Sequence, residues 1–103
     1  MPRATGRVGD AELQRFRAID CALILPFLTD YCKPDLDFVP IKDSHTHRWQ
    51  LVAGGRQFEL LTTGPKWFDT HANRGGGGAI DLAMHLLRLD FKQAVGKLRE
   101  VLP

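Results

Sequence analysis

The sequence contains few cysteines and no long hydrophobic run, and each shortage excludes a class of protein. Two cysteines in 103 residues, Cys21 and Cys32, are too few for a disulfide framework and do not form the Cys-x-x-Cys pair of a metal knuckle. We expect both to be small buried side chains. The longest apolar run, residues 21–25, is far shorter than the roughly 18 to 20 residues that span a bilayer. We therefore expect no membrane partner.

Signals for secretion and for catalysis are also scarce. The first nine residues contain Arg3 and Arg7 but lack the apolar segment of a signal peptide, so the expected compartment is the cytoplasm. The chain has no acids paired at a usable spacing, no Gly-x-Ser-x-Gly motif and no evident serine or cysteine nucleophile with its base. We predict that this chain alone is not an enzyme and that it needs no cofactor.

The composition is that of one small globular domain with an uneven charge distribution. The chain is 44% hydrophobic and 25% charged, which suits a single core. Residues 1–9 lack periodicity and are predicted to be disordered, and residues 10–103 to form one domain. Seven acids face four bases between residues 10 and 43, whereas eight bases face five acids between residues 44 and 103. An anionic partner is expected to bind the second half.

The first third of the chain predicts two short helices and an irregular connection. Asp10 and Asp20 each precede apolar residues at helical spacing and are expected to cap a helix. Pro26 lies too deep for the first helical turn, so the second helix should bend or restart there. Residues 33–44 contain two prolines and predict an extended connection with room for a short edge strand at residues 38–41.

The middle of the chain changes to the alternation of β-strands. Residues 48–53 and 56–62 predict two strands joined by a Gly54-Gly55 turn, because glycine takes the positive φ angles of a two-residue hairpin loop. Residues 66–70 predict a third antiparallel strand. These strands supply the side chains of an apolar sheet face that must be covered: Trp49, Leu51, Phe58, Leu60, Trp67 and Phe68.

The last quarter predicts two helices that cover the sheet. Residues 79–89 are apolar nearly all round, with a narrow polar strip in which His85 is expected to be a hydrogen-bonded surface residue. Asp90 and Gln93 have the spacing of a capping box that starts the last helix. The face of that helix predicted to pack on the sheet is Phe91, Ala94, Val95, Leu98 and Leu102. The predicted fold class is α+β: a small antiparallel sheet of three to four strands with two N-terminal and two C-terminal helices.

A glycine run precedes the first of these two helices. Arg74 is followed by Gly75, Gly76, Gly77 and Gly78, and backbone amides at a helix N-terminus favour a phosphate. The run has neither the Lys-Ser/Thr of a P-loop nor the spacing of a dinucleotide fingerprint. It predicts either a flexible or tightly bent connection or a loose contact with a nucleic-acid phosphate.

Three histidines raise the question of a metal site. His45, His47 and His71 are metal-ligand types but would need Asp or Cys partners close by. The alternative is that they are solvated loop residues, and we predict no metal.

Aromatic and basic residues are interleaved in the predicted strands. Trp49 and Trp67 alternate with bases, a pattern typical of surfaces that bind single-stranded nucleic acid. The alternative is that both tryptophans belong to the core and that the bases form a solvated face. The candidate nucleic-acid-binding residues are Arg48, Arg56, Lys66, His71, Arg74, Gly75, Gly76, Gly77 and Gly78.

Two segments, residues 66–82 and 89–95, together resemble a known family. They contain Lys-Trp-Phe, then Arg-Gly-Gly-Gly-Gly-Ala-Ile-Asp-Leu, then Leu-Asp-Phe-Lys-Gln-Ala-Val. This order resembles the N-terminal zinc-ribbon domain of DnaG-type bacterial DNA primases, and more closely the primase-like domains of plasmids and integrative mobile elements that precede a Toprim domain. The resemblance covers roughly residues 48–102.

The chain departs from this family at the zinc ligands. Alignment by the aromatic and glycine positions puts Arg48, Leu51, Thr70 and Asn73 where the family has Cys-x-x-His and Cys-x-x-Cys. None of these side chains is a thiolate or imidazole ligand, so we predict a zinc-free ribbon. Its stability must then come from burial, with at least one tryptophan in the core.

The resemblance implies a function. The family's ribbon reads the DNA template, which implies that this chain binds single-stranded DNA for DNA replication or mobile-element transfer. A Toprim primase catalytic domain or another replication protein is then the expected partner. The alternative is an adaptor that lost DNA binding with its zinc and docks a protein through its acidic N-terminal helices. An enzyme that uses the glycine run to hold a nucleotide is a third and weaker hypothesis.

Overall fold

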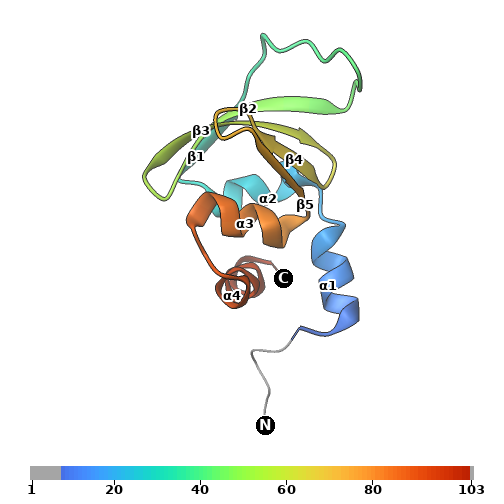
Figure 1. The fold of residues 1–103 in the computed structure, drawn as a ribbon, viewed down its shortest axis with the longest axis vertical. Helices are drawn as coiled ribbons and strands as arrows, with labels where there is room; N and C mark the ends of the chain where they lie inside the picture. Colours follow the sequence, from blue (N-terminus) through green and yellow to red (C-terminus); the bar gives the residue numbers. More distant parts are fainter. Residues whose placement is uncertain (1–7, 103) are drawn as a thin grey trace.

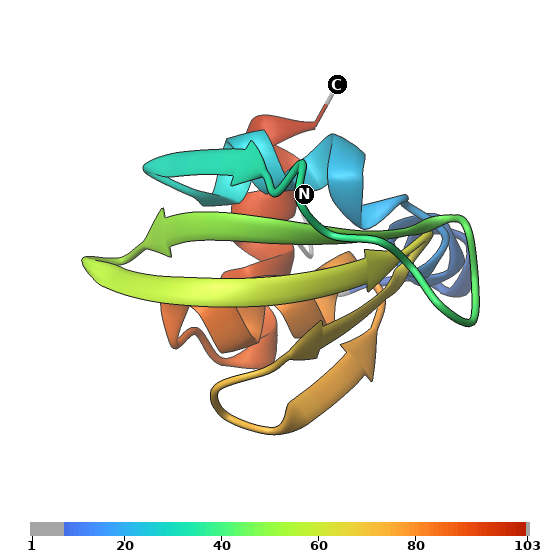
Figure 2. The same ribbon diagram turned by 90° about the horizontal axis from the view of Figure 1, so that it is seen from above.

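The computed structural model describes residues 8–102, and within that range it has four helices and one five-stranded antiparallel sheet. The helices are α1 (Asp10–Arg17), α2 (Cys21–Leu28), α3 (Ala79–Leu87) and α4 (Phe91–Val101). The strands are β1 (Tyr31–Pro34), β2 (Thr46–Ala53), β3 (Arg56–Thr63), β4 (Lys66–Asp69) and β5 (Arg74–Gly77), and they lie in this order across the sheet (Figure 2). The α+β class is confirmed. The predicted disorder of residues 1–9 falls mostly outside the described residues.

The central hairpin is confirmed. Gly54 and Gly55 have φ angles of 56° and 77°, as a two-residue turn requires. Ala53 pairs with Arg56, and the register continues to Thr46 opposite Thr63. Lys66 to Asp69 then add the predicted third strand of this meander.

Two further strands lie at the sheet edges, where the sequence predicted a loop and a turn. β1 comes directly after α2 and pairs with β2, whereas the edge strand suggested at residues 38–41 does not form. Pro40 lacks an amide for a ladder, and Val39 and Ile41 are 76% and 97% exposed. Most of the glycine run is a strand and not a connection, because residues 74–77 pair with residues 66–69 of β4.

The sheet is covered by helices on one face. α2 and α3 lie directly against it, and α4 packs on the far side of α3 (Figure 1). The prediction that the last helix packs on the sheet is therefore wrong. Ala94, Val95 and Leu98 are buried against α3, but Phe91 is 47% exposed in the first turn of α4 and is not part of the core.

The predicted N-caps of α2 and α4 are present, whereas the start of α1, the course of α2 and the end of α3 differ from the prediction. Asp20 caps α2 by accepting from the Ala22 amide, and the capping box of Asp90 and Gln93 is complete. Gly9, not Asp10, is the N-cap of α1, and α2 continues through Pro26 without restarting. α3 ends at Leu87, two residues earlier than predicted.

The core lies between the sheet and α2 and α3. Its members include Leu60, Leu82 and Leu86, which are fully buried, and Trp67, which is 5% exposed. Cys21 is buried, and burial raises the pKa of its thiol to about 12, whereas Cys32 is half-buried. Within residues 8–102, no helix is long and apolar enough to cross a membrane.

Candidate nucleic-acid interface

The sheet has two unlike faces, and the predicted basic residues are divided between them. We call the side that packs on α2 and α3 the covered face and the other side the open face. Side chains alternate along a strand. With Leu60 and Trp67 buried on the covered face, Lys66 and Phe68 lie on the open face. By the same alternation Arg48 lies on the open face, whereas Arg56 and Arg74 lie on the covered face.

Arg48 and Arg56 are already engaged in contacts within the chain. Arg48 binds the Asp35 carboxylate through Nε at 2.9 Å and Nη2 at 2.8 Å, and its guanidinium lies 5.1 Å from the centre of the Phe38 ring. Arg56 donates through Nη2 to the carbonyl oxygens of His85 and Leu86 at the end of α3. The prediction of one solvent-facing basic surface that includes Arg56 is therefore wrong. Arg48 fixes the loop of residues 35–45, and Arg56 fixes α3.

The glycines of β5 allow two aromatic rings to lie across the edge of the sheet. A Cβ atom on Gly75 would lie 3.0 Å from Phe68 Cδ1, and one on Gly76 would lie 2.7 Å from Trp67 Cζ2. Gly75 pairs with Phe68 and Gly76 with Trp67. Each ring thus covers a glycine of the neighbouring strand, one ring on each face. The absence of side chains at these positions is a packing requirement.

The N-terminus of α3 is buried. Gly78, at φ 90°, Ala79 and Ile80 are all buried, and the Gly78 amide donates to the Pro65 carbonyl at 2.8 Å. A Cβ atom on Gly78 would lie 3.1 Å from Arg17 Cα. The helix start on which the predicted phosphate contact depends therefore faces the protein, whereas Gly75 and Gly77 are exposed at the sheet edge.

His85 lies in a polar cluster beneath the sheet. Its Nε2 is 2.7 Å from Asp69 Oδ2, and its ring stacks on Trp67 with centroids 4.8 Å apart. Its side chain is 12% exposed, so it is hydrogen-bonded as predicted but is not a surface residue. Burial raises the pKa of Asp69, but hydrogen bonds from His85 and from the amides of Ala72 and His71 outweigh burial and hold the pKa below its usual value.

The other histidines lie apart from one another, with His47 in β2 opposite Thr62 and the other two in loops. His71 is exposed in the turn after β4, and His45 binds Asp43 at 3.1 Å. Among residues 8–102 no three His, Cys, Asp or Glu side chains gather closely enough to hold a metal ion. Of the four positions aligned with zinc ligands, Leu51 is buried and Arg48 is paired with Asp35.

Both tryptophans lie on the covered face. Trp67 is in the core, as predicted for at least one of them, and its buried Nε1 has no hydrogen-bond partner among residues 8–102. Trp49 is half-buried and donates from Nε1 to Thr62 Oγ1 at 2.9 Å. The tryptophans are therefore not the exposed rings that a nucleic-acid base would stack on.

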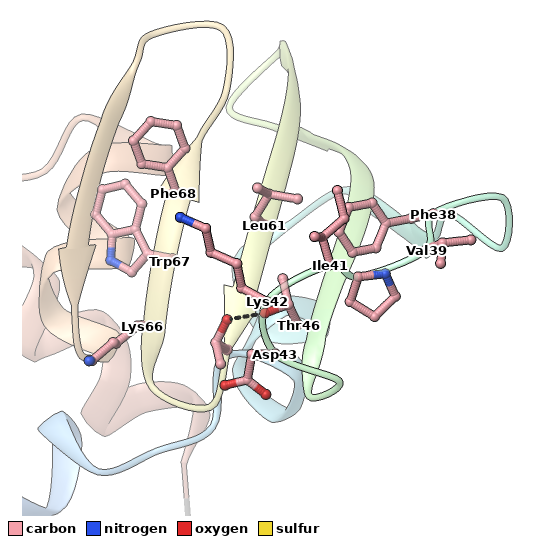
Figure 3. Close-up of a pocket in the computed structure, with 12 residues that line it drawn as sticks. Phe38, Val39, Ile41, Lys42, Asp43, Thr46, Leu61, Lys66, Trp67 and Phe68 are labelled. Carbon is pink, nitrogen blue, oxygen red and sulfur yellow. Dashed lines mark hydrogen bonds between the residues drawn. The ribbon is translucent and has the colours of Figure 1, made fainter.

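Phe68, which was expected to belong to the covered apolar face of the sheet, has an exposed ring on the open face. Phe68 is 37% exposed on the open face and lies at one side of a groove of about 430 Å³. The loop of residues 35–45 forms the other side (Figure 3). We call this the apolar groove, and its lining includes Phe38, Val39, Ile41, Lys42, Leu61, Lys66 and Phe68. Adjacent residues in a strand point to opposite faces of the sheet, so the sequence already indicated that only one of Trp67 and Phe68 can face the core.

Two lysines stand at the apolar groove. Lys66 precedes the two aromatic residues in β4, and Lys42 extends from the loop toward Phe68 (Figure 3). Neither forms an ion pair with a residue in the range 8–102. Asp43 also lines the groove, but it is hydrogen-bonded to His45. The groove thus combines an exposed aromatic ring, aliphatic walls and two available cations.

Comparisons with protein families, with curated proteins and with solved structures gave no match to this chain.

Proposed function

We propose that this chain is a non-catalytic module that binds single-stranded DNA in the apolar groove. The observation that carries the proposal is the pair formed by an exposed Phe68 and an adjacent Lys66 on a sheet face that no helix among residues 8–102 covers. The resemblance to primase ribbons supports the same ligand and favours a Toprim primase catalytic domain as the partner of this module.

Phe68 is suited to stack on a base. Its ring packs against Gly75, where an added Cβ atom would lie 3.0 Å from Phe68 Cδ1, and this contact restricts the ring before a base covers it. Leu61 and Ile41 offer apolar contacts beside it, in a space large enough for a nucleobase. Stacking tolerates any base, so this contact predicts weak sequence preference.

The lysines are suited to hold the backbone on either side of that base. Lys42 extends across the apolar groove toward Phe68, whereas Lys66 lies on the β4 side with its amino end directed away from the groove (Figure 3). A strand that passes over Phe68 and leaves the groove across β4 would bring phosphates near both. Arg48 supports this arrangement indirectly, because its ion pair with Asp35 and its contact with Phe38 fix the loop that carries Lys42.

The test is a titration of a fluorescently labelled single-stranded oligonucleotide at two salt concentrations. Phe68→Ala should weaken binding by about 1 to 3 kcal/mol, the value of one stacked base. The double variant Lys42→Glu, Lys66→Glu should weaken binding further and flatten the salt dependence by about 0.7 per lost phosphate contact. Lys92→Glu, Lys97→Glu makes the same charge change on α4 and is the matched control. Equal binding by both double variants would refute the proposed surface.

A second candidate function is docking of a protein through the N-terminal helices. Leu23 and Phe27 are one turn apart on α2 and are 69% and 52% exposed. Exposed apolar residues at this spacing are typical of protein contacts. Titration with a separately produced Toprim catalytic domain distinguishes the two functions. Binding of that domain lost in Leu23→Ser, with no DNA binding by the parent chain, would favour the adaptor.

A further inference from the structure

A second cavity lies on the covered face, between the edge of the sheet and α3. It has a volume of about 480 Å³. Its lining includes three arginines, Arg56, Arg74 and Arg88, together with Trp67, Asp81 and His85. We call it the arginine cleft. It is separate from the apolar groove, which opens on the other face of the sheet.

The three arginines come from three different elements. Arg56 begins β3, Arg74 begins β5 and Arg88 follows α3. The fold therefore brings together cations that are 14 to 32 positions apart in the sequence. Grouping like charges is unfavourable without a counter-charge, and the lining offers only partial compensation, through Asp81.

Arg56 is held in place before any ligand arrives. Its Nη2 donates to the carbonyl oxygens of His85 and Leu86 at 3.2 and 3.1 Å, and its guanidinium lies 4.7 Å from the centre of the Phe58 ring. The side chains of Arg74 and Arg88, in contrast, form no hydrogen bond or ion pair with any residue between positions 8 and 102. The arginine cleft therefore has one fixed guanidinium and two that are available to a ligand.

Arg88 occupies a backbone conformation that favours glycine. It ends α3 at φ 55° and ψ 44°, the left-handed region in which most L residues are strained. A residue that costs stability at its position is a candidate for a binding role, since glycine there would be the more stable choice.

We propose that the arginine cleft binds a phosphate group, with Arg74 and Arg88 as its direct ligands. A guanidinium donates two parallel hydrogen bonds to phosphate oxygens, and several guanidinium groups around one cavity are well suited to a di- or triphosphate. The phosphate could belong to a free nucleotide or to the backbone of a bound nucleic acid. This site does not depend on DNA binding in the apolar groove.

The test uses calorimetric titration of the parent chain with inorganic pyrophosphate, with ATP and with a single-stranded oligonucleotide. Arg88→Gly should weaken pyrophosphate binding about tenfold, because it removes a charge-assisted contact. The same variant should melt at the same or a higher temperature, since glycine adopts the backbone conformation of residue 88 without strain. A lower affinity with no loss of stability separates a ligand from a structural residue.

Two further variants check the sign of the charge that the arginine cleft binds. Asp81→Asn should strengthen pyrophosphate binding, because the exposed Asp81 carboxylate repels an anion in the cleft. Lys92→Gln removes a positive charge from α4, outside the cleft, and should have no effect. Unchanged affinity in both Arg88→Gly and Asp81→Asn, or no binding of any probe to the parent chain, would overturn the proposal.

The three probes distinguish the source of the phosphate. ATP and pyrophosphate binding that falls in Arg88→Gly, with oligonucleotide binding unchanged, assigns the site to a free nucleotide. Oligonucleotide binding that falls in Arg88→Gly, together with pyrophosphate binding, assigns it to a nucleic-acid backbone. Loss of oligonucleotide binding in Phe68→Ala alone concerns the apolar groove and leaves this proposal intact.

Discussion

Trp67 and Phe68 are neighbours in one strand, yet they lie in opposite environments. Trp67 points to the covered face, where it is 5% exposed and stacks on His85. Phe68 points to the open face, where it is 37% exposed beside the apolar groove. Each covers a glycine of β5. In this account, two adjacent aromatic residues have different roles: Trp67 stabilises the core, and Phe68 is available for binding.

The division extends to the charged residues around the two rings. Beside Trp67, Asp69 and His85 are hydrogen-bonded to each other and Arg56 binds the end of α3. Of the arginines that line the arginine cleft on this face, only Arg74 and Arg88 have side chains that are unpaired within residues 8–102. On the open face, Lys66 and Lys42 are without ion-pair partners among residues 8–102. The following predictions test whether the two faces separate as this contrast requires.

The largest expected effect is the difference between truncating the two rings. Trp67→Ala should cost about 3 to 5 kcal/mol of unfolding free energy, because it leaves a cavity in the core of a small domain. Phe68→Ala should cost about 1 kcal/mol or less, because its ring is already partly exposed. Denaturant unfolding of both variants measures the difference. Equal losses would contradict the division between the two faces.

The next effect compares two glycines of β5. Gly76→Ala would bring a Cβ atom to 2.7 Å from Trp67 Cζ2, and forcing that ring to move should cost about 1 to 3 kcal/mol. Gly77→Ala meets nothing within 4 Å and should change stability by about 0.5 kcal/mol or less. Thermal melting of the pair checks this. A stable Gly76→Ala variant would mean that Trp67 does not pack on the strand.

A smaller effect is expected on the loss of stability at low pH. The Asp69 carboxyl has a lowered pKa in the folded chain, so it contributes stability above its unfolded pKa of about 4. That contribution is lost as the pH falls through the lowered folded value. Unfolding free energies measured from pH 6 to pH 2 should fall less steeply in Asp69→Asn than in the parent chain.

The Asp69→Asn variant should still lose some stability as the pH falls, because other carboxyl groups also have lowered pKa values. Glu12 also has a lowered pKa, chiefly because it accepts a hydrogen bond from Arg99. The pKa of Glu59 is also lowered, chiefly because its carboxylate accepts a hydrogen bond from the Thr70 hydroxyl. An identical acid slope in Asp69→Asn and the parent chain would show that the Asp69 contact with His85 does not stabilise the fold.

The smallest expected effect is that of metal removal. The positions aligned with zinc ligands hold Arg48, Leu51, Thr70 and Asn73, none of which is a zinc ligand of the expected kind. The melting temperature should therefore be the same with and without a strong chelator. One zinc per chain by elemental analysis, with unfolding in chelator, would contradict this prediction.

The sequence predicted the elements that have strong local signals. The Gly54-Gly55 turn and the capping box of Asp90 and Gln93 each depend on residues a few positions apart, and both are present. The strand of Arg74 to Gly77 was missed because glycine has no strand preference of its own. It forms because rings from the neighbouring strand cover it, which is a tertiary effect.

The candidate site was only partly predictable, for a similar reason. Hairpin pairing of Ala53 with Arg56 already places Arg56 on the face opposite Arg48, so this division could have been found. The apolar groove could not, because its far wall is the loop of residues 35–45. That loop is held over the sheet by the long-range contact between Arg48 and Asp35.

The most direct test of the central claim is an NMR titration with single-stranded DNA that follows the methyl groups of two adjacent leucines. Leu61 lies on the open face in the apolar groove, and Leu60 is fully buried on the covered face. The account predicts that Leu61 and the Phe68 ring shift on addition of DNA while Leu60 does not. Shifts confined to the covered face, or none at low salt, would contradict it.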